Sequence, residues 1–373
     1  MSAAARVAGL TTSPIRAIAS GAPADAISLA LGEPGWDFPS VARESLAAWT
    51  ETAQHCTYGP NTGIPELTTA LVGYTGLDAE QIMVTAGSQA GMFAIFQAHV
   101  EPGSQVLIPD PAFPAYETLA VLAGATVIRY PVGAAHELDA NFLIDALNSA
   151  SRPSLVVIGH PANPTGGAAS AHMLNRVAGH CDQLGVPLLS DEVYRELWLD
   201  QPQPSVREVS NTALVLESVS KGWAAPGLRV GWVTGPATLL APARLIHNAM
   251  NTAPARPSQV AAAALISHSA EVLTESRAQV RARWDVLANS PLAQHSARNA
   301  QAGFYHWLEL PPWADADPSA FILRVRDEGK VLVVPGSAFG PAGQHYVRVS
   351  LGGSLHTLYD GLARLAPWWE RQC

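Results

Sequence analysis

Residues 154–192 read SLVVIGHPANPTGGAASAHMLNRVAGHCDQLGVPLLSDE, and this stretch shows the pattern that decides the fold. Two short apolar runs, at 154–159 and 186–190, are bounded by glycine, proline or acidic residues, as buried strands commonly are. Between them, residues 170–184 have a helical pattern, for which Ser170 is a suitable N-cap. A strand, a helix and a second strand in this order predict two parallel strands of a covered sheet.

The same alternation extends along most of the chain. Five further apolar runs predict strands at 81–85, 105–109, 125–129, 213–218 and 230–234. A helical pattern at 258–288 predicts one long helix, and shorter strand and helix patterns follow it. We therefore predict an α/β fold, in which a three-layer αβα large domain with a mostly parallel seven-stranded sheet is joined to a smaller α+β domain.

The length of 373 residues exceeds the size at which a single hydrophobic core usually stops growing, which also indicates two domains. We expect an N-terminal arm and part of the small domain at 1–40, the large domain at 41–275, and the small C-terminal domain at 276–373. In an open α/β sheet, ligands bind beyond the carboxyl ends of the strands, so the residues that follow each run are the candidates for a site.

The composition limits the kinds of partner. The net charge is −9 and no run of lysine or arginine occurs, so the basic surface that nucleic-acid binding needs is missing. We expect small-molecule partners, no nucleic acid and no membrane, and a cytoplasmic location, since neither a signal sequence nor an apolar run of about 18 residues is present. Cys56, Cys181 and Cys373 are too widely separated for a disulfide framework or a zinc site, and we expect no metal.

Only two of the 22 basic residues are lysines, Lys221 and Lys330. Lys221 follows the run at 213–218, lies beside Ser218 and Ser220, and precedes Arg229 by eight residues. Burial and cationic neighbours lower the pKa of a lysine, which allows Schiff-base formation, while hydroxyl groups and an arginine suit a phosphate. Taken alone, the segment could also be a solvated loop. Lys330 has acidic neighbours and fits a solvated helix end.

Two neighbouring strand ends carry further polar groups. Asn163 follows the run at 154–159, and Asp191 and Tyr194 follow the run at 186–190. A carboxylate, an amide and a phenol match a pyridine ring with a 3-oxygen, because Asp191 can keep the ring nitrogen protonated while Asn163 and Tyr194 bind the oxygen. Singly, each motif could equally be a turn or a strand-end cap.

Motifs before and after these three complete a set. They are Leu31-Gly32-Glu33-Pro34, Tyr58-Gly-Pro-Asn-Thr-Gly63-Ile-Pro-Glu66-Leu, Thr85-Ala86-Gly87-Ser88-Gln89, Pro109-Asp-Pro-Ala-Phe113-Pro-Ala-Tyr116 and Tyr346-Val-Arg348-Val-Ser350. In this order and spacing the chain resembles the fold-type I pyridoxal-phosphate enzymes of the aspartate aminotransferase (class I/II) family, from Leu31 to about Leu351. The resemblance implies pyridoxal 5′-phosphate as cofactor, carried as a Schiff base on Lys221.

The resemblance also implies a role for each matching residue. The catalytic group comprises Lys221, Asp191 and Tyr194. The phosphate is expected at the helix start formed by Ala86, Gly87 and Ser88, with Ser218, Ser220 and Arg229, and with Tyr58 from the partner of a homodimer. Phe113 is expected to stack on the cofactor ring. Arg348 is expected to grip the substrate carboxylate, assisted by Asn163 and the backbone of Gly32.

The implied reaction is a ping-pong transfer of the amino group of an L-amino acid to a 2-oxo acid. A β- or γ-lyase of the same fold, including one that breaks a C–S bond, is the alternative, and a non-enzymatic binding domain is a weaker one. For the substrate side chain, His247 and Arg256 are candidate basic groups. Trp36 and Phe339 favour instead an apolar or aromatic side chain, unless they are ordinary packing residues.

Overall fold

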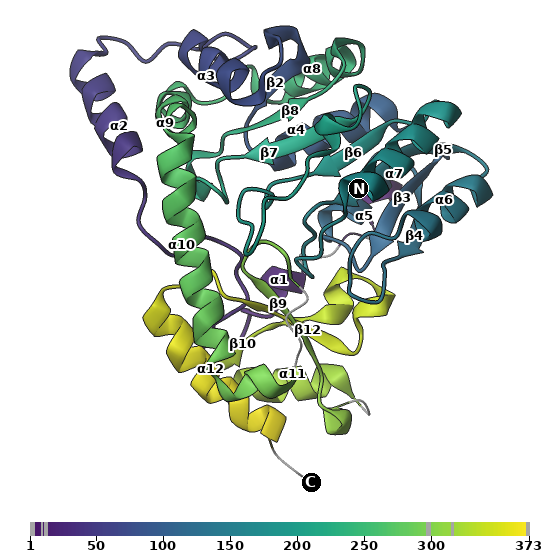
Figure 1. Cartoon of the computed structure of the whole chain (residues 1–373), viewed down its shortest axis with the longest axis vertical. Helices are drawn as coiled ribbons and strands as arrows, with labels where there is room; N and C mark the ends of the chain where they lie inside the picture. Colours follow the sequence, from purple (N-terminus) through teal and green to yellow (C-terminus); the bar gives the residue numbers. More distant parts are fainter. Residues whose placement is uncertain (1–3, 9, 11–13, 296–299, 315–316, 371–373) are drawn as a thin grey trace.

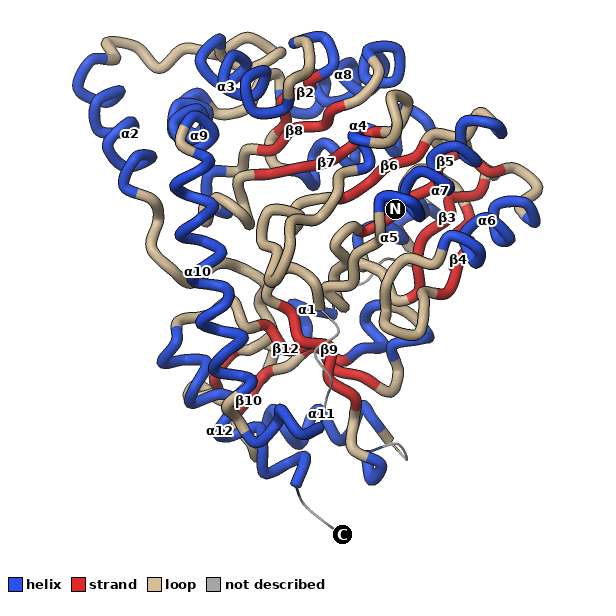
Figure 2. Tube along the Cα trace, in the orientation of Figure 1, coloured by secondary structure: helices blue, strands red, loops and turns tan. Residues whose placement is uncertain are grey.

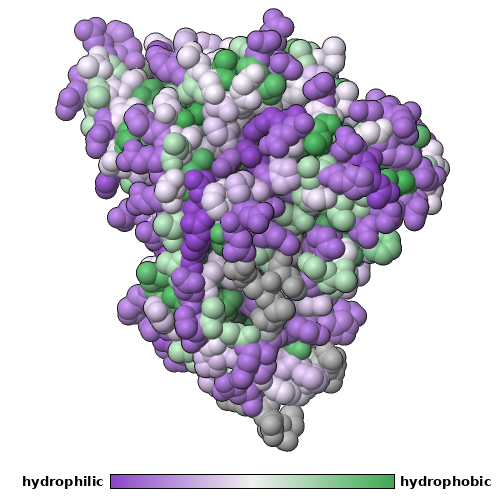
Figure 3. Space-filling view, viewed as in Figure 1, coloured by the Kyte–Doolittle hydropathy of each residue, from purple (hydrophilic) through white to green (hydrophobic). Residues whose placement is uncertain are grey.

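The computed structural model describes residues 4–8, 10, 14–295, 300–314 and 317–370 (Figure 1). A broad α/β unit occupies the upper part of the view, and a smaller unit built from the C-terminal residues lies below it. In the space-filling view, hydrophilic residues cover most of this face, and apolar residues occur in small groups between them (Figure 3). Within the described residues, no helix is both long and apolar enough to cross a membrane.

The large unit is built on a seven-stranded sheet. In spatial order its strands are β2 (Ile82–Thr85), β8 (Gly231–Thr234), β7 (Leu214–Ser218), β6 (Leu188–Asp191), β5 (Pro153–Gly159), β3 (Gln105–Asp110) and β4 (Thr126–Pro131). Strand β8 runs antiparallel to both of its neighbours, and the other neighbouring pairs are parallel. The predicted mostly parallel seven-stranded sheet is therefore confirmed.

Helices cover both faces of this sheet, because the side chains of a buried strand alternate between two apolar layers. On β5, Leu155 and Val157 pack into one core, and Val156 and Ile158 pack into another. The first core is closed by α4 (Ser88–His99), α5 (Ala115–Leu122) and α8 (Ala237–Asn251), and the second by α6 (Ala140–Ser149) and α7 (Ala171–Leu184). The result is the predicted three-layer architecture.

Helix α7 shows how the local sequence sets the ends of an element. The Ser170 hydroxyl accepts a hydrogen bond from the Met173 N–H at 3.3 Å, as predicted for an N-cap. Gly185 ends the helix in the left-handed conformation with φ +65°, where glycine is favoured. Strands β5 and β6 on either side of α7 are parallel, with Gly159 opposite Asp191.

The predicted single helix at 258–288 is wrong in one respect. The structure has two helices, α9 (Arg256–Ser267) and α10 (Ser269–Ala288), with His268 outside both. Helix α9 packs with α3 (Pro65–Thr75) in a third apolar core. The long α10 continues downwards to the smaller unit (Figure 1).

The smaller unit combines strands with helices (Figure 2). Its antiparallel strands are β11 (Val334–Pro335), β12 (Tyr346–Ser350) and β9 (Tyr305–Glu309), and α11 (Pro318–Asp327) and α12 (Leu355–Glu370) pack beside them. Near the N-terminus, β1 (Ile27–Ser28) pairs in parallel with β10 (Val331–Leu332). The segments α1 (Pro14–Ala17) and α2 (Ser40–Thr52) flank β1 in the sequence.

Candidate active site

A cavity of about 300 Å³ lies beyond the carboxyl ends of β5, β6 and β7, where the smaller unit meets the sheet. Most of the residues predicted for the site line it: Gly32, Ser88, Phe113, Asn163, Asp191, Tyr194, Ser220, Lys221, Arg229 and Arg348. They come from at least five separate stretches of the sequence. The fold therefore brings together groups that the sequence presents as independent motifs.

Lys221 lies directly beyond β7, and its side chain reaches towards the N-terminal part of the chain. Its Nζ donates a 2.5 Å hydrogen bond to the carbonyl oxygen of Gly32 and lies 5.7 Å from the centre of the Tyr194 ring. Lys330 has a different setting, since its Nζ pairs at 2.5 Å with Asp25 on the exposed surface. Of the two lysines, only Lys221 lines the cavity.

Asp191 at the end of β6 presents a buried carboxylate to the cavity. Its Oδ2 accepts a 2.9 Å hydrogen bond from the Tyr116 hydroxyl, whereas its buried Oδ1 has no partner among the described residues. Burial raises the pKa of Asp191 to about 6, although the hydrogen bond from Tyr116, the backbone N–H of Val193 and the charge of Lys221 act in the opposite direction. A cationic N–H donor in the cavity would satisfy Oδ1 and favour the ionised form.

Two tyrosines from different units meet beside Asp191. The hydroxyl groups of Tyr194 and Tyr305 are 2.8 Å apart, and both side chains are buried. Tyr305 also packs against Gly32 so closely that a Cβ at position 32 would clash with its hydroxyl. This contact explains why glycine is needed beside the Lys221 amine.

A cradle for an anion lies between the start of α4 and Arg229. Gly87 precedes the helix with φ +80°, and a Cβ there would clash with the Arg229 guanidinium. Ser218 and Ser220 add two hydroxyls, 2.7 Å apart. Free N–H groups at a helix start, an arginine and two hydroxyls suit a phosphate group.

Ala86 takes a different place in this cradle from the one expected. Its backbone N–H donates a 3.2 Å hydrogen bond to Nε2 of His247, away from the cavity. Ala86 and Gly87 do not appear in the lining of the cavity, whereas Ser88 does.

Arg348 on β12 forms the opposite wall. Its Nη1 donates to Asn163 Oδ1 at 2.9 Å, and its Nη2 donates to the Ala30 carbonyl at 2.7 Å. The guanidinium carbon lies 4.2 Å from the centre of the Tyr305 ring and 5.0 Å from that of Phe339. Because the group is fixed in a buried position with donors to spare, it is suited to binding a carboxylate in a bidentate manner.

Phe113 lines the cavity, whereas the residues considered for contact with the substrate side chain do not. Phe113 lines the cavity and packs edge-on against Tyr116, with ring centres 5.7 Å apart. Phe339 covers Arg348, and Trp36 packs on Phe304. The lining contains neither Trp36 nor Phe339, and it contains neither His247 nor Arg256. Arg256 instead donates to Thr57 at 3.1 Å.

Tyr58 stands apart from the other predicted residues. Its side chain is 86% exposed and does not line the cavity.

Sequence reasoning missed Tyr116 and Tyr305. Tyr116 carried a signal, because it stands three residues after Phe113 in a motif that follows a strand. Tyr305 had none, since only the fold brings it to Tyr194.

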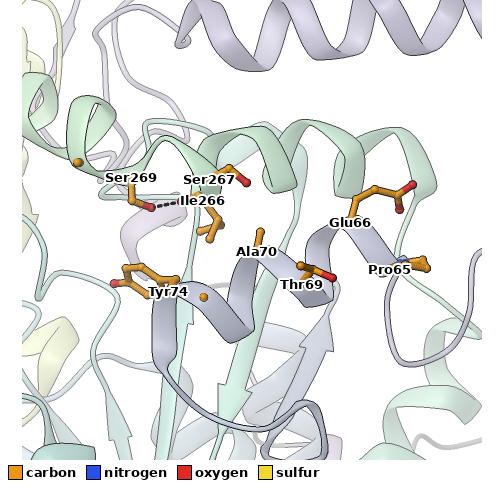
Figure 4. Close-up of a pocket in the computed structure, with 10 residues that line it drawn as sticks. Pro65, Glu66, Thr69, Ala70, Tyr74, Ile266, Ser267 and Ser269 are labelled. Atoms are coloured by element: carbon orange, nitrogen blue, oxygen red, sulfur yellow. Dashed lines mark hydrogen bonds between the residues drawn. The ribbon is translucent and has the colours of Figure 1, made fainter.

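A second cavity, of about 830 Å³, lies between α3 and the end of α9 (Figure 4). Pro65, Glu66, Thr69, Ala70 and Tyr74 of α3 lie along one side of it, and the Ser269 hydroxyl donates to the Ile266 carbonyl on the other. It is an open groove, and none of the residues predicted for the site lines it. We therefore base the site on the smaller but chemically equipped cavity around Lys221.

Comparisons with known proteins agree with this choice. The family model described as "Aminotransferase class I and II" matches residues 24–365. An aspartate aminotransferase of Pyrococcus horikoshii is 28% identical, over 91% of this chain and 90% of the relative. A probable N-acetyl-LL-diaminopimelate aminotransferase of Bacillus subtilis is 29% identical, over 91% and 88%.

Solved structures show the same similarity in three dimensions. Aspartate aminotransferase from Thermus thermophilus, in a complex with maleate, has a TM-score of 0.90 at 25% identity, covering 99% of this chain and 100% of that one. An aminotransferase from Mycobacterium tuberculosis has a TM-score of 0.90 at 26% identity and covers 100% of both chains.

Proposed function

Because the chain belongs to the class I and II aminotransferase family and is a pyridoxal-phosphate-dependent transaminase, we propose that the cavity around Lys221 is its active site. One observation carries this assignment: the buried Oδ1 of Asp191 lacks a partner in the cavity that also holds the Lys221 amine. A buried carboxylate oxygen needs a donor, and the protonated ring nitrogen of pyridoxal phosphate is one.

The other cofactor contacts follow from the same cavity. Phe113 would cover the ring, and Asn163 and Tyr194 would bind its 3-oxygen. The phosphate would be held by the N–H group of Ser88 at the start of α4 with Ser218, Ser220 and Arg229, while Ala86 and Gly87 would shape the turn beside it. The close packing of Arg229 on Gly87 and the pair of serine hydroxyls support this part of the proposal.

When bound, pyridoxal phosphate supplies an aldehyde that takes up the amino group and a protonated ring that accepts the negative charge left at the substrate α-carbon. Asp191 would keep the proton on the ring nitrogen. The positive charge of the protonated ring would offset the free-energy cost of burying the Asp191 carboxylate. Lys221 Nζ holds the cofactor between turnovers. Once displaced by the substrate amine, Nζ would be the base that removes the proton from the substrate α-carbon and delivers it to the C4′ carbon of the cofactor.

Substrate orientation is assigned to Arg348 and its neighbours. The α-carboxylate would bind the donors of Arg348 that are not used by Asn163 and Ala30, with the Gly32 backbone beside it. Fixing the carboxylate sets the direction of the α C–H bond relative to Lys221. An L-amino acid would then leave as its 2-oxo acid before a second oxo acid enters, in a ping-pong sequence.

Borohydride reduction of the cofactor-loaded protein, followed by peptide mass spectrometry, tests the assignment of Lys221. We expect the pyridoxyl group on Lys221, and no stable attachment in Lys221→Ala. Lys330→Ala is the matched control, because it removes the only other lysine, which is exposed and paired with Asp25, and it should leave labelling and activity unchanged. Labelling of Lys330, or none at all, would rule out the proposed site.

We also propose that the enzyme is a homodimer with shared active sites, in which Tyr58 of a second copy completes the phosphate site. The exposure of Tyr58 supports this, as does the exposure of Leu245 and Met250 on α8, 71% and 43% respectively. Large apolar side chains that are exposed in one chain are typical of surfaces covered by a partner.

We also propose small-molecule partners, a cytoplasmic location and two domains. The net charge of −9 supports small-molecule partners without nucleic acid. A large domain at 41–275 and a small one at 276–373 remain proposals. The second boundary falls inside α10, so a continuous helix would link the two domains.

A further inference from the structure

The turn between β2 and α4 is held in three ways. The Thr85 hydroxyl donates to the Gly87 carbonyl at 2.9 Å, and the Gly87 N–H donates back to the Thr85 carbonyl at 2.8 Å. The third bond leaves the turn, from the Ala86 N–H to His247 Nε2 at 3.2 Å. The turn is thus closed on itself and tied to α8 at one point.

His247 is well placed to be a permanent acceptor. Its side chain is 1% exposed, on the last turns of α8. Because Nε2 accepts from Ala86, the ring proton must be on Nδ1 and the ring must be neutral. Burial lowers the pKa of His247, which favours this neutral form. The Asn251 amide lies 3.4 Å from the same nitrogen.

The bond has a consequence for the cavity side of the turn. With the Ala86 N–H bound from behind, Gly87 stays at φ +80° against Arg229, and α4 starts at Ser88 with its first N–H groups free. A turn free to rotate about Ala86 would move these donors, and small displacements weaken charge-assisted hydrogen bonds.

We propose that His247 is a positioning residue for the cofactor phosphate, acting by fixing the Thr85–Ser88 turn from outside the cavity. It makes no contact with the cofactor or the substrate. The inference rests on the proposed function, since it takes pyridoxal phosphate as the ligand of the cradle. Because His247 acts through the turn, its loss weakens the binding of the cofactor phosphate and leaves the contacts to the pyridine ring of the cofactor unchanged.

The test compares pyridoxal phosphate with pyridoxal, which lacks the phosphate, as ligands of the apo protein. His247→Leu removes the acceptor and leaves the half-buried Ala86 N–H without this partner. We expect affinity for pyridoxal phosphate to fall about 5- to 100-fold, the effect of one such loss, while affinity for pyridoxal stays within about twofold. His247→Gln keeps an acceptor oxygen and should retain more of the phosphate preference.

His99→Leu is the matched control. His99 Nε2 donates to the Leu239 carbonyl at 2.9 Å and so joins the end of α4 to α8, away from the turn. This variant should leave the ratio of the two affinities unchanged. Equal weakening of both ligands in His247→Leu, or no weakening of either, would overturn the inference. Failure of the unaltered protein to bind pyridoxal phosphate would instead overturn the proposed function as well.

A second measurement needs no variant, in case His247→Leu does not fold. In the ¹⁵N-labelled holoenzyme, His247 should be neutral with its proton on Nδ1, and Nε2 should show coupling across the hydrogen bond to the Ala86 amide. A proton on Nε2 would contradict the inference.

Discussion

At the scale of single residues, contacts on several sides hold Arg348 in place. It is 1% exposed, aromatic rings flank its guanidinium group, and Asn163 and Ala30 fix its orientation. Arg348→Lys keeps the charge but loses the planar fork. We expect kcat/KM for the amino donor to fall about 10- to 100-fold, which corresponds to the loss of a charge-assisted hydrogen bond. Steady-state kinetics at saturating oxo acid measures this.

A surface arginine provides the control for Arg348→Lys. Arg326 pairs with its neighbour Asp327 at 2.6 Å and does not line the cavity. Arg326→Lys should change kcat/KM less than about twofold, because exposed ion pairs contribute little. A kcat/KM for Arg348→Lys within threefold of the unaltered enzyme would argue against carboxylate binding by this residue.

At this scale, the sequence can predict the site residues that come directly after a strand. Asn163, Asp191 and Lys221 each follow a recognisable strand, so their convergence follows from the sheet. The roles of Tyr116 and Tyr305 arise from contacts with residues 75 and 111 positions away. No local pattern encodes such pairs. For the same reason, the sequence suggested His247 as a substrate contact, whereas its ring binds the backbone of Ala86.

At the scale of elements, the junction of β2 with α4 depends on one glycine. Gly87 has φ +80° and ψ 163°, a conformation almost confined to glycine, and it packs on Arg229. We expect Gly87→Ala to weaken binding of pyridoxal phosphate at least about tenfold, since both the turn and Arg229 must move; strain of this kind costs about 1–3 kcal/mol. Fluorescence titration of the apo protein measures the affinity.

The control for Gly87→Ala is a glycine inside a helix. Gly179 lies in α7, and a Cβ there would meet no atom within 4 Å. Gly179→Ala should raise the free energy of unfolding by about 0.5–1 kcal/mol and leave cofactor affinity unchanged. Equal cofactor affinity in the two variants would contradict the role given to Gly87.

The break between α9 and α10 shows the limit of pattern reading for elements. The apolar helical period continues through 258–288, so the sequence predicts one helix. At 267–269 the residues are Ser, His and Ser, and the Ser269 hydroxyl binds the Ile266 carbonyl at 2.6 Å. The His268 ring also binds a backbone carbonyl, that of Ala264. Side chains that compete for backbone groups favour a helix end, but their effect depends on packing.

At the scale of the whole molecule, the number and type of strands in the sheet could be predicted, because buried runs and intervening helices are local features. The order β2-β8-β7-β6-β5-β3-β4 could not. It requires β8 to enter between β2 and β7 and run against both, which no neighbouring residue signals.

One buried charge cluster ties several elements of the large unit together. Glu217 on β7 is 2% exposed and binds Arg207 at 2.6 Å and the Trp232 indole at 3.0 Å. Burial alone would raise the pKa of Glu217, but the charges of Arg207 and Arg195 outweigh it and lower the pKa to about 2. The ionised form therefore stabilises the fold above about pH 4.5, and this contribution is lost as the pH falls towards 2.

We expect Glu217→Gln to reduce the free energy of unfolding by about 3–5 kcal/mol at pH 7, because it leaves buried arginine charge uncompensated. The difference from the unaltered protein should shrink below pH 4.5, where Glu217 starts to bind a proton in the unfolded chain. Urea denaturation at several pH values measures both effects. Exposed Glu208→Gln is the control and should change stability by less than about 0.5 kcal/mol. A pH-independent difference would contradict the electrostatic explanation.

A shared active site predicts complementation between two inactive subunits. In a hybrid of Tyr58→Phe with Lys221→Ala, one of the two sites would combine an intact Lys221 with an intact Tyr58 from the other subunit. Mixing the two variants, each with low activity, should therefore restore activity to about a quarter of that of the unaltered dimer, because about half of the reassorted dimers are hybrids and each hybrid has one intact site. Activity equal to the sum of the separate variants would contradict shared sites.

The most direct test of the central claim is a single half-reaction. The cofactor-loaded protein is mixed with one amino acid at a time, without any oxo acid, while its visible absorption and the products are followed. We predict that the absorption of the Lys221-linked cofactor is lost as one equivalent of the matching 2-oxo acid per subunit appears, and that Lys221→Ala shows neither change. Continued release of ammonia and oxo acid without an acceptor would indicate a lyase and contradict the account.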